Sequence, residues 1–355
     1  MNINNKHEDL ESDNILLIRI LGLKPLETTD LDLINELSER KLRKLYWYAK
    51  INKISFTYLK ALEKAGVLKE IPELEKELEI QERIYEKHLR SIEIIRDILT
   101  DLGIDHVFIK TIYDFPILPS DIDVLIYGKT LENIALDLIK RGLRVFDKGP
   151  HFISIYNTVV DSSTPRPKMS YDVDIYDEIS LGYFKYIDKS LCSSDRYKHP
   201  RGVEVLSAEC ELLIHINHSL FEHLFTLSHL YILSMLLPRI NFHKLEALSN
   251  LSKSRIPLML ASVIVNEILR HHQEGVSSSL VKFIKTFQNK KYATIKVNQL
   301  PYRYSLKHIV EAIIEKLHGK YYLFSMLEFT HAFRSQKELN HIIFHIIWRR
   351  KRITY

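Results

Sequence analysis

Apolar residues near both ends of the chain recur at the three- and four-residue spacing of amphipathic helices. This pattern predicts helices over residues 1–70. The longest predicted helix runs from residue 72 to 102, and Gly103, directly after it, suits the left-handed conformation that ends many helices. From Glu209 onward the pattern is helical again. It includes an apolar segment over Leu224–Leu237 that is too short to span a membrane and predicts a buried helix.

The middle of the chain changes period. Short runs rich in β-branched and aromatic residues predict strands there, at residues 106–110, 120–127, 144–146, 152–158 and 169–176, with one helix at 131–141. Helices followed by a group of strands predict an α+β fold with a mixed β-sheet. We expect an N-terminal helical region at 1–80, a sheet-containing core at 81–205 and a C-terminal helical domain with a basic tail at 206–355.

Composition narrows the class of protein. The chain has 355 residues, of which 46% are hydrophobic and 27% charged, as in soluble globular proteins. Its only cysteines are Cys192 and Cys210, so neither a disulfide framework nor a zinc ribbon is indicated. The polar N-terminus has no signal-peptide pattern, and we expect a cytoplasmic protein without a membrane partner.

The whole chain has a net charge of +5, and two of its segments are strongly basic. One is the helical stretch Arg40–Lys44, which is followed by aromatic residues, and the other is the tail Trp348–Arg352. Both are compatible with nucleic acid as a partner. For the helical stretch a solvated basic face is the favoured interpretation, whereas for the tail a solubilising terminus and a phosphate-binding segment both stay open.

Four histidines, His215, His218, His223 and His229, lie in the C-terminal helical region. Histidine is a common metal ligand, but no cysteine or carboxylate stands at ligand spacing beside them. Packing or surface roles are the more usual explanation.

Acidic residues enter two of the predicted strands. Asp121 and Asp123 open one strand, and Asp172 and Asp174 lie in a later one. Side chains in a strand alternate between faces, so the members of each pair point the same way, about 7 Å apart. Repulsion between such carboxylates is relieved by a divalent cation, and oxygen ligands suit Mg²⁺. The alternative is a strand whose acidic end lies in water.

If the two strands are neighbours, three or four carboxylates converge. Such an arrangement is what two-metal phosphoryl or nucleotidyl transfer requires. Lys110, at the end of the preceding strand, can then reach a phosphate as a point charge.

The order of these segments resembles the nucleotidyltransferase superfamily to which DNA polymerase β belongs, and more narrowly an uncharacterised nucleotidyltransferase family. The resemblance covers roughly residues 80–240 and rests on Val107–Lys110, Asp121–Ile126, Val173–Ile175, Glu204–Leu213 and the histidine-rich helix after it. It implies a nucleotidyltransferase-like core in which Asp121, Asp123 and Asp174 are catalytic and hold Mg²⁺ or Mn²⁺. It also implies an NTP substrate and an acceptor hydroxyl on an RNA end, a small molecule or a protein.

One turn departs from the family pattern. Where the families have a glycine after the first strand, this chain has Lys110-Thr111, and no glycine occurs between Gly103 and Gly128. A glycine there lets backbone N–H groups approach a triphosphate. Either Lys110, Thr111 and Ser120 surround the phosphates in an active branch, or the fold persists without the chemistry and binds nucleic acid or a protein partner.

Overall fold

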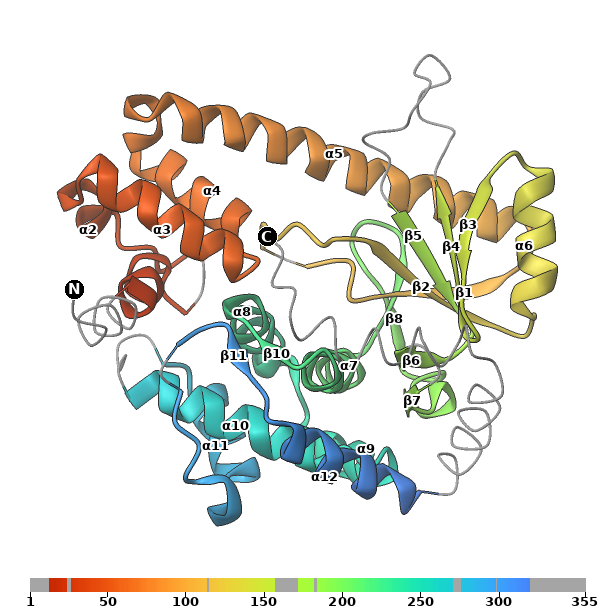
Figure 1. Cartoon of the computed structure of the whole chain (residues 1–355). Coiled ribbons are helices and arrows are strands. Elements are labelled where there is room, and N and C mark those ends of the chain that lie inside the picture. Colours follow the sequence, from red (N-terminus) through yellow and green to blue (C-terminus); the bar gives the residue numbers. More distant parts are fainter. Residues whose placement is uncertain are drawn as a thin grey trace.

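The computed structural model describes residues 13–23, 27–113, 115–156, 172–181, 184–270, 276–297 and 299–319. Over these residues the fold is α+β, as predicted, with helical regions before and after a mixed seven-stranded sheet. Figure 1 shows the N-terminal helices at one end, the sheet at the other, and the last helices running beneath. The predicted basic tail at 348–352 lies outside the described residues.

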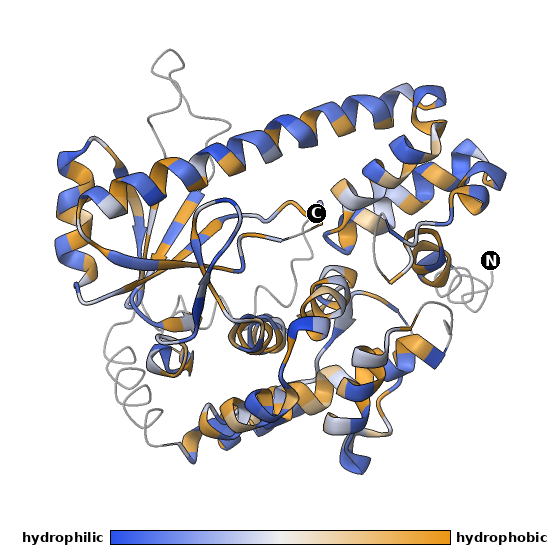
Figure 2. Ribbon diagram, turned by 180° about the vertical axis from the view of Figure 1, so that it is seen from behind, coloured by the Kyte–Doolittle hydropathy of each residue, from blue (hydrophilic) through white to orange (hydrophobic). Residues whose placement is uncertain are grey.

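Two of the N-terminal helices begin at polar caps, and the longest begins at a proline. Asp30 and Ser38 each accept a backbone N–H from the first turn of the helix that follows, and Pro72 starts the long helix at its first position. Figure 2 shows hydrophobic and hydrophilic positions interleaved along that helix. It crosses residue 80 without a break, so the three-region division stays a prediction. The helices are residues 13–21, α2 (Leu31–Glu36), α3 (Glu39–Ile51), α4 (Ser55–Ala65) and α5 (Pro72–Asp101).

The main sheet has the strand order β3-β4-β5-β2-β1-β9-β8. β2 pairs with β5 in parallel and β1 with β9 in parallel, and the remaining neighbours are antiparallel. The strands are β1 (Asp105–Ile109), β2 (Ile122–Tyr127), β3 (Arg144–Lys148), β4 (Phe152–Tyr156), β5 (Asp172–Tyr176), β8 (Arg196–Lys198) and β9 (Glu204–Leu206). A separate pair is β6 (Ile179–Leu181) and β7 (Phe184–Ile187).

The two faces of this sheet pack into different cores. Val124 of β2 belongs to the core that contains residues of α5 and of α6 (Leu131–Lys140), whereas Leu125 belongs to the larger core that includes residues of α7 (Ala208–Phe221). Because strand side chains alternate, Asp123 shares the face of Leu125. The acid is thus directed away from the face that α5 and α6 cover.

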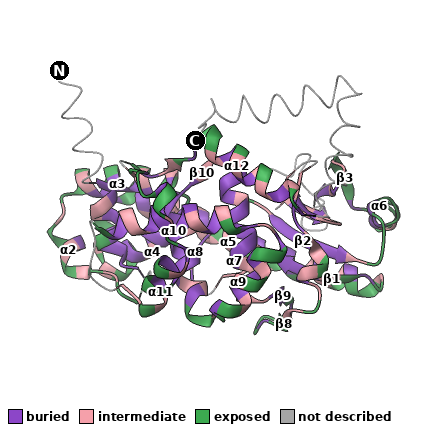
Figure 3. Cartoon of the chain, turned by 90° about the horizontal axis from the view of Figure 1, so that it is seen from below, coloured by how far each residue is buried: buried purple, intermediate pink, exposed green. Residues whose placement is uncertain are grey.

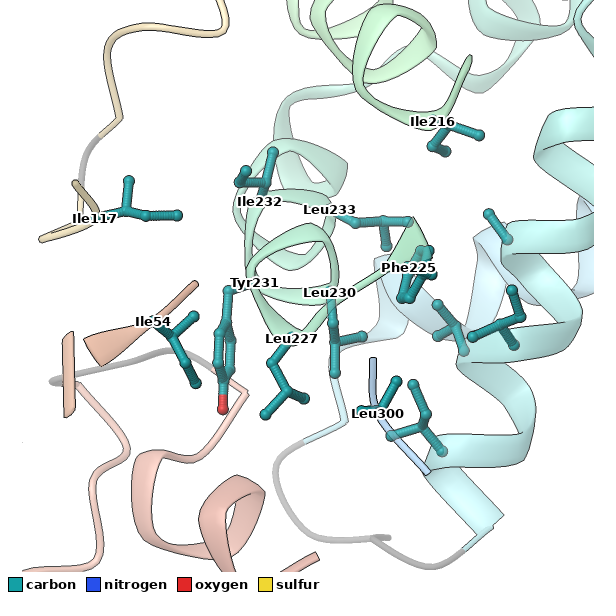
Figure 4. Close-up of a cluster of buried hydrophobic side chains, with 14 of the residues drawn as sticks. Ile54, Ile117, Ile216, Phe225, Leu227, Leu230, Tyr231, Ile232, Leu233 and Leu300 are labelled. Carbon is teal, nitrogen blue, oxygen red and sulfur yellow. The ribbon is translucent and has the colours of Figure 1, made fainter. Parts of the chain in front are cut away.

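Three helices of the C-terminal region are largely buried. Buried residues run along α7, α8 (Leu227–Leu236) and α10 (Arg255–Arg270) (Figure 3). Figure 4 shows Leu227, Leu230 and Tyr231 of α8 projecting among hydrophobic side chains from other elements. The remaining elements of this region are α9 (Phe242–Leu251), α11 (Ser278–Phe287) and α12 (Leu306–Leu317), with the short pair β10 (Leu224–Phe225) and β11 (Tyr302–Arg303).

The apolar segment after α7 differs in detail from the prediction of one continuous helix over Leu224–Leu237. His223 has φ 65°, and Leu224–Phe225 form β10 before the helix begins at Leu227. The left-handed residue turns the chain and Thr226 caps the new helix, two features that apolar periodicity does not record. None of the described helices combines the length and the hydropathy needed to cross a membrane.

Candidate metal centre

Two neighbouring strands bring three of the predicted acids together. The parallel register of β2 and β5 places Asp123 opposite Asp174. β2 begins at Ile122, so Asp121, which was predicted to open the strand, lies in the bend just before it. One carboxylate oxygen from each of the three lies within 4.8 Å of the other two. The predicted meeting of the two acidic segments is confirmed, and Asp174 rather than Asp172 belongs to the cluster.

Asp123 lies at the buried centre of the cluster. Its Oδ2 is 2.7 Å from Lys110 Nζ, while its Oδ1 is buried and has no hydrogen-bond partner among the described residues. Burial, opposed by Lys110 and reinforced by the neighbouring acids, raises the pKa of Asp123 to about 7. A buried carboxylate oxygen without a donor fits a cation, because unpaired buried charge is costly.

Asp174 is held by donors on its own strand and the next. The Ser154 hydroxyl on β4 donates to Asp174 Oδ1, and the Tyr176 hydroxyl lies 3.3 Å from Oδ2. Burial raises the pKa of Asp174. Sequence reasoning missed Ser154, although it is the single hydroxyl in the apolar stretch Phe152–Ile155 and lies directly opposite Asp174 in the β4–β5 register.

Ser120 and Asp121 lie on the solvent-exposed side of the cluster. The Ser120 hydroxyl donates to Asp121 Oδ1 over 3.0 Å, and Ser120 is exposed whereas Asp121 is half-buried. The structure therefore places this predicted phosphate-contacting hydroxyl beside an acid of the cluster.

The turn after β1 supplies the counter-charge. Lys110 has φ 50°, in the left-handed region that usually favours glycine. Burial opposes the charge on Lys110, but Asp123 outweighs that effect and the pKa of the lysine is raised. Thr111 is buried, its hydroxyl accepts the backbone N–H of Asp123 over 2.9 Å, and the same hydroxyl lies 2.8 Å from the carbonyl oxygen of Ile109. The Thr111 hydroxyl thus serves the backbone of the two strands.

Glu211 and Tyr113 hold the Lys110 backbone, and His215 holds Tyr113 in turn; sequence reasoning assigned none of the three a place in the site. Glu211 Oε2 of α7 accepts the Lys110 N–H over 3.1 Å, and the Tyr113 hydroxyl donates to the Lys110 carbonyl over 2.7 Å. Tyr113 also lies 3.1 Å from His215 Nε2. Because the tyrosine proton is used on Lys110, His215 Nε2 is the donor in that second bond.

Burial dominates the electrostatics behind the turn. It raises the pKa of Glu211 to about 7, with Lys110 acting in the opposite direction, and it lowers the pKa of His215 well below its usual value. A neutral His215 agrees with its role as a donor to Tyr113. The sequence marks Glu211 only as an acid in the first turn of a helix and His215 only as the first of four histidines. Neither feature indicates a contact with Lys110.

Two other histidines of this region, His218 and His229, make bonds within their own helix or its cap. His229 Nδ1 accepts the backbone N–H of Thr226 over 3.1 Å and caps α8, and His218 Nε2 lies 3.3 Å from Glu222. In the part of the chain that the structure describes, the three aspartates form the one group of three or more acids, histidines or cysteines placed to hold a metal.

A pocket of about 430 Å³ adjoins the same turn. Its volume falls within the roughly 300–1,000 Å³ of small-molecule sites. Tyr113 belongs both to its wall and to the bonds behind Lys110. The lining residues are Lys60, Tyr85, Tyr113, Phe115, Pro116, His199 and Arg201.

The basic segment of α3 makes ion pairs within the chain. Lys41 and Lys44 both pair with the buried Asp13, the latter over 2.6 Å, and Arg43 pairs with Glu73 of α5. Charge that is balanced internally attracts phosphate less strongly. The nucleic-acid interpretation of this helix stays a prediction, and the helix geometry does not strengthen it.

Comparisons with protein-family models, curated proteins and solved structures found no match to this chain. The mixed sheet and a cluster of three aspartates that could hold a metal ion are the structural features from which a function is proposed below.

Proposed function

We propose that the chain is a metal-dependent nucleotidyltransferase that moves NMP from an NTP to an acceptor hydroxyl. Asp121, Asp123 and Asp174 would hold Mg²⁺ or Mn²⁺. The observation that supports this best is Asp123 Oδ1, a buried carboxylate oxygen with no hydrogen-bond partner among the described residues, within a cluster of three acids. Three carboxylates near one ammonium leave a negative charge that a divalent cation balances.

In this reaction the acceptor hydroxyl gives its proton to a carboxylate of the cluster and its oxygen bonds to the α-phosphorus. The bond between the α-phosphorus and the oxygen that bridges to the β-phosphorus breaks, and pyrophosphate leaves. Bound divalent cations supply Lewis acidity to the phosphates and to the acceptor hydroxyl. Asp174 is the acid best fixed in place, because Ser154 and Tyr176 occupy its two oxygens. We assign phosphate contact to Lys110 and Ser120, and a positioning role to Thr111.

The test is transfer of labelled nucleotide from a panel of NTPs to RNA, protein and small-molecule hydroxyls. Asp123→Asn and Asp174→Asn are expected to lower the rate by at least about 100-fold, as for other groups that stabilise transition-state charge. Asp147→Asn is the matched control, because Asp147 lies in the same sheet, on β3, and is exposed. Transfer that persists in both cluster variants while they remain folded would remove the catalytic assignment.

A second candidate function is supported by the turn. The Thr111 hydroxyl is engaged with backbone atoms and Lys110 with Asp123, so neither is free to face a phosphate as the site stands. A nucleotidyltransferase-fold protein without catalysis would bind nucleic acid or a protein instead. Nucleic-acid binding of this kind should weaken steeply with salt and be indifferent to Mg²⁺ and to Asp123→Asn. An affinity that does not change with salt would contradict it.

A further inference from the structure

The ammonium of Lys110 already occupies a cation position in the acid cluster. Its Nζ lies 2.7 Å from Asp123 Oδ2, and the side chain is only 11% exposed. A metal on Asp123 therefore meets a competing positive charge. If the metal displaces Lys110 from the carboxylate, a largely buried ammonium loses its partner, which is unfavourable.

When a metal binds, the side chain of Lys110 can move but its backbone cannot. Its N–H is bonded to Glu211 and its carbonyl to Tyr113, so the backbone is held on both sides. The four-carbon stem of lysine is flexible, and rotation within it moves the ammonium without moving the turn. An anion that arrives beside the metal offers that ammonium a new partner.

We propose that Lys110 exchanges Asp123 for a phosphate, so that the site takes a divalent cation together with a polyphosphate and binds the cation alone poorly. This rests on the proposed function and specifies its substrate as the metal–polyphosphate complex. Lys110 acts as a positioning and selecting group: it weakens binding of the bare cation and strengthens binding of the pair. The lysine, rather than a glycine-lined loop, supplies the preference for phosphate.

The test is equilibrium dialysis of Mn²⁺ at pH 8, with and without inorganic tripolyphosphate at equal concentration in both compartments. The wild-type protein is expected to retain Mn²⁺ at least about tenfold more tightly when tripolyphosphate is present. Lys110→Met should bind Mn²⁺ alone about tenfold more tightly than the wild type and gain little from tripolyphosphate. Lys189→Met is the matched control, because Lys189 Nζ contacts the Ile126 carbonyl of β2 rather than an acid of the cluster.

Each outcome decides between the two proposals. If the wild-type protein binds Mn²⁺ with the same affinity in the absence and in the presence of tripolyphosphate, the exchange is overturned and the metal centre remains. Absence of Mn²⁺ binding under both conditions overturns the metal centre and, with it, the exchange. The wild-type comparison needs no substitution, so it stands even if Lys110→Met does not fold. Asp123→Asn should abolish retention under both conditions, and retention that survives it would place the ion elsewhere and overturn the exchange.

Discussion

Asp123 depends on Thr111 for its direction. The backbone N–H of Asp123 donates to the Thr111 hydroxyl, which in turn lies within hydrogen-bond distance of the Ile109 carbonyl oxygen. One buried hydroxyl therefore joins the end of β1 to the start of β2. The position of the central carboxylate follows from this bond as well as from the strand pairing.

Thr111→Val keeps the shape of the side chain and removes its hydroxyl. The buried N–H of Asp123 then lacks its partner, so the free energy of unfolding should fall by about 1–3 kcal/mol. Urea unfolding measures this loss, and Mn²⁺ dialysis should show weaker binding. Thr111→Ser, which keeps the hydroxyl, should lose less stability and retain the metal. Equal effects of Val and Ser would show that the hydroxyl has no such role.

At the scale of elements, α8 begins at a cap that needs an uncharged imidazole. His229 Nδ1 accepts the N–H of Thr226, so that nitrogen carries no proton. Burial above all, with Lys53 nearby, lowers the pKa of His229 to about 3. The unfolded chain, with a pKa near 6.5, binds the proton more readily. The stability that depends on this neutral state is present above about pH 6.5 and is lost as the pH falls toward 3.

His229→Gln should therefore flatten the pH dependence of folding. Between pH 7.5 and pH 5 the wild-type protein loses about 2 kcal/mol through this residue, from 1.36 kcal/mol per pKa unit. Burial also lowers the pKa of His88, to about 4, and the pKa of His215 and of His218, so the slope decreases without vanishing. Urea unfolding at pH 7.5 and at pH 5 measures the change in the free energy of unfolding. His243→Gln, at an exposed position on α9, is the control. An unchanged slope in His229→Gln would contradict the cap argument.

The sequence pattern predicted where helices and strands lie better than which strands pair and which side chains meet. Alternation placed Asp121 and Asp123 on one face, because it depends only on neighbouring residues. The parallel register that sets Asp123 opposite Asp174 needs the whole sheet. The bond from Glu211 to Lys110 joins residues 101 positions apart, so no spacing rule could suggest it. Strands of three residues, such as β8 and β9, are too short to show a period.

Across the whole molecule, the N-terminal helices are tied to the region that holds the metal centre. The loop between β1 and β2 carries Ile117 into a hydrophobic cluster with Ile54 and Ile232 (Figure 4), and the Thr57 hydroxyl of α4 donates to the Pro116 carbonyl. The same loop starts at the turn that α7 holds through its bond to Lys110. The loop thus contacts α4 through its middle and α7 through its start, and so connects the helices before the sheet with those after it.

Asn52 makes the most direct link between these regions. It is fully buried, its Oδ1 accepts the N–H of Leu227 over 3.2 Å, and its carbonyl accepts the N–H of Ser228 over the same distance. Asn52→Ala leaves the Leu227 N–H without its acceptor, so unfolding should become easier by about 1–3 kcal/mol. If the regions unfold as one unit, far-ultraviolet circular dichroism and differential scanning calorimetry should show the same single transition on heating. Asn250→Ala, at an exposed site on α9, should leave both unchanged. Two separate transitions would show instead that the N-terminal helices fold on their own and support the metal centre only by contact.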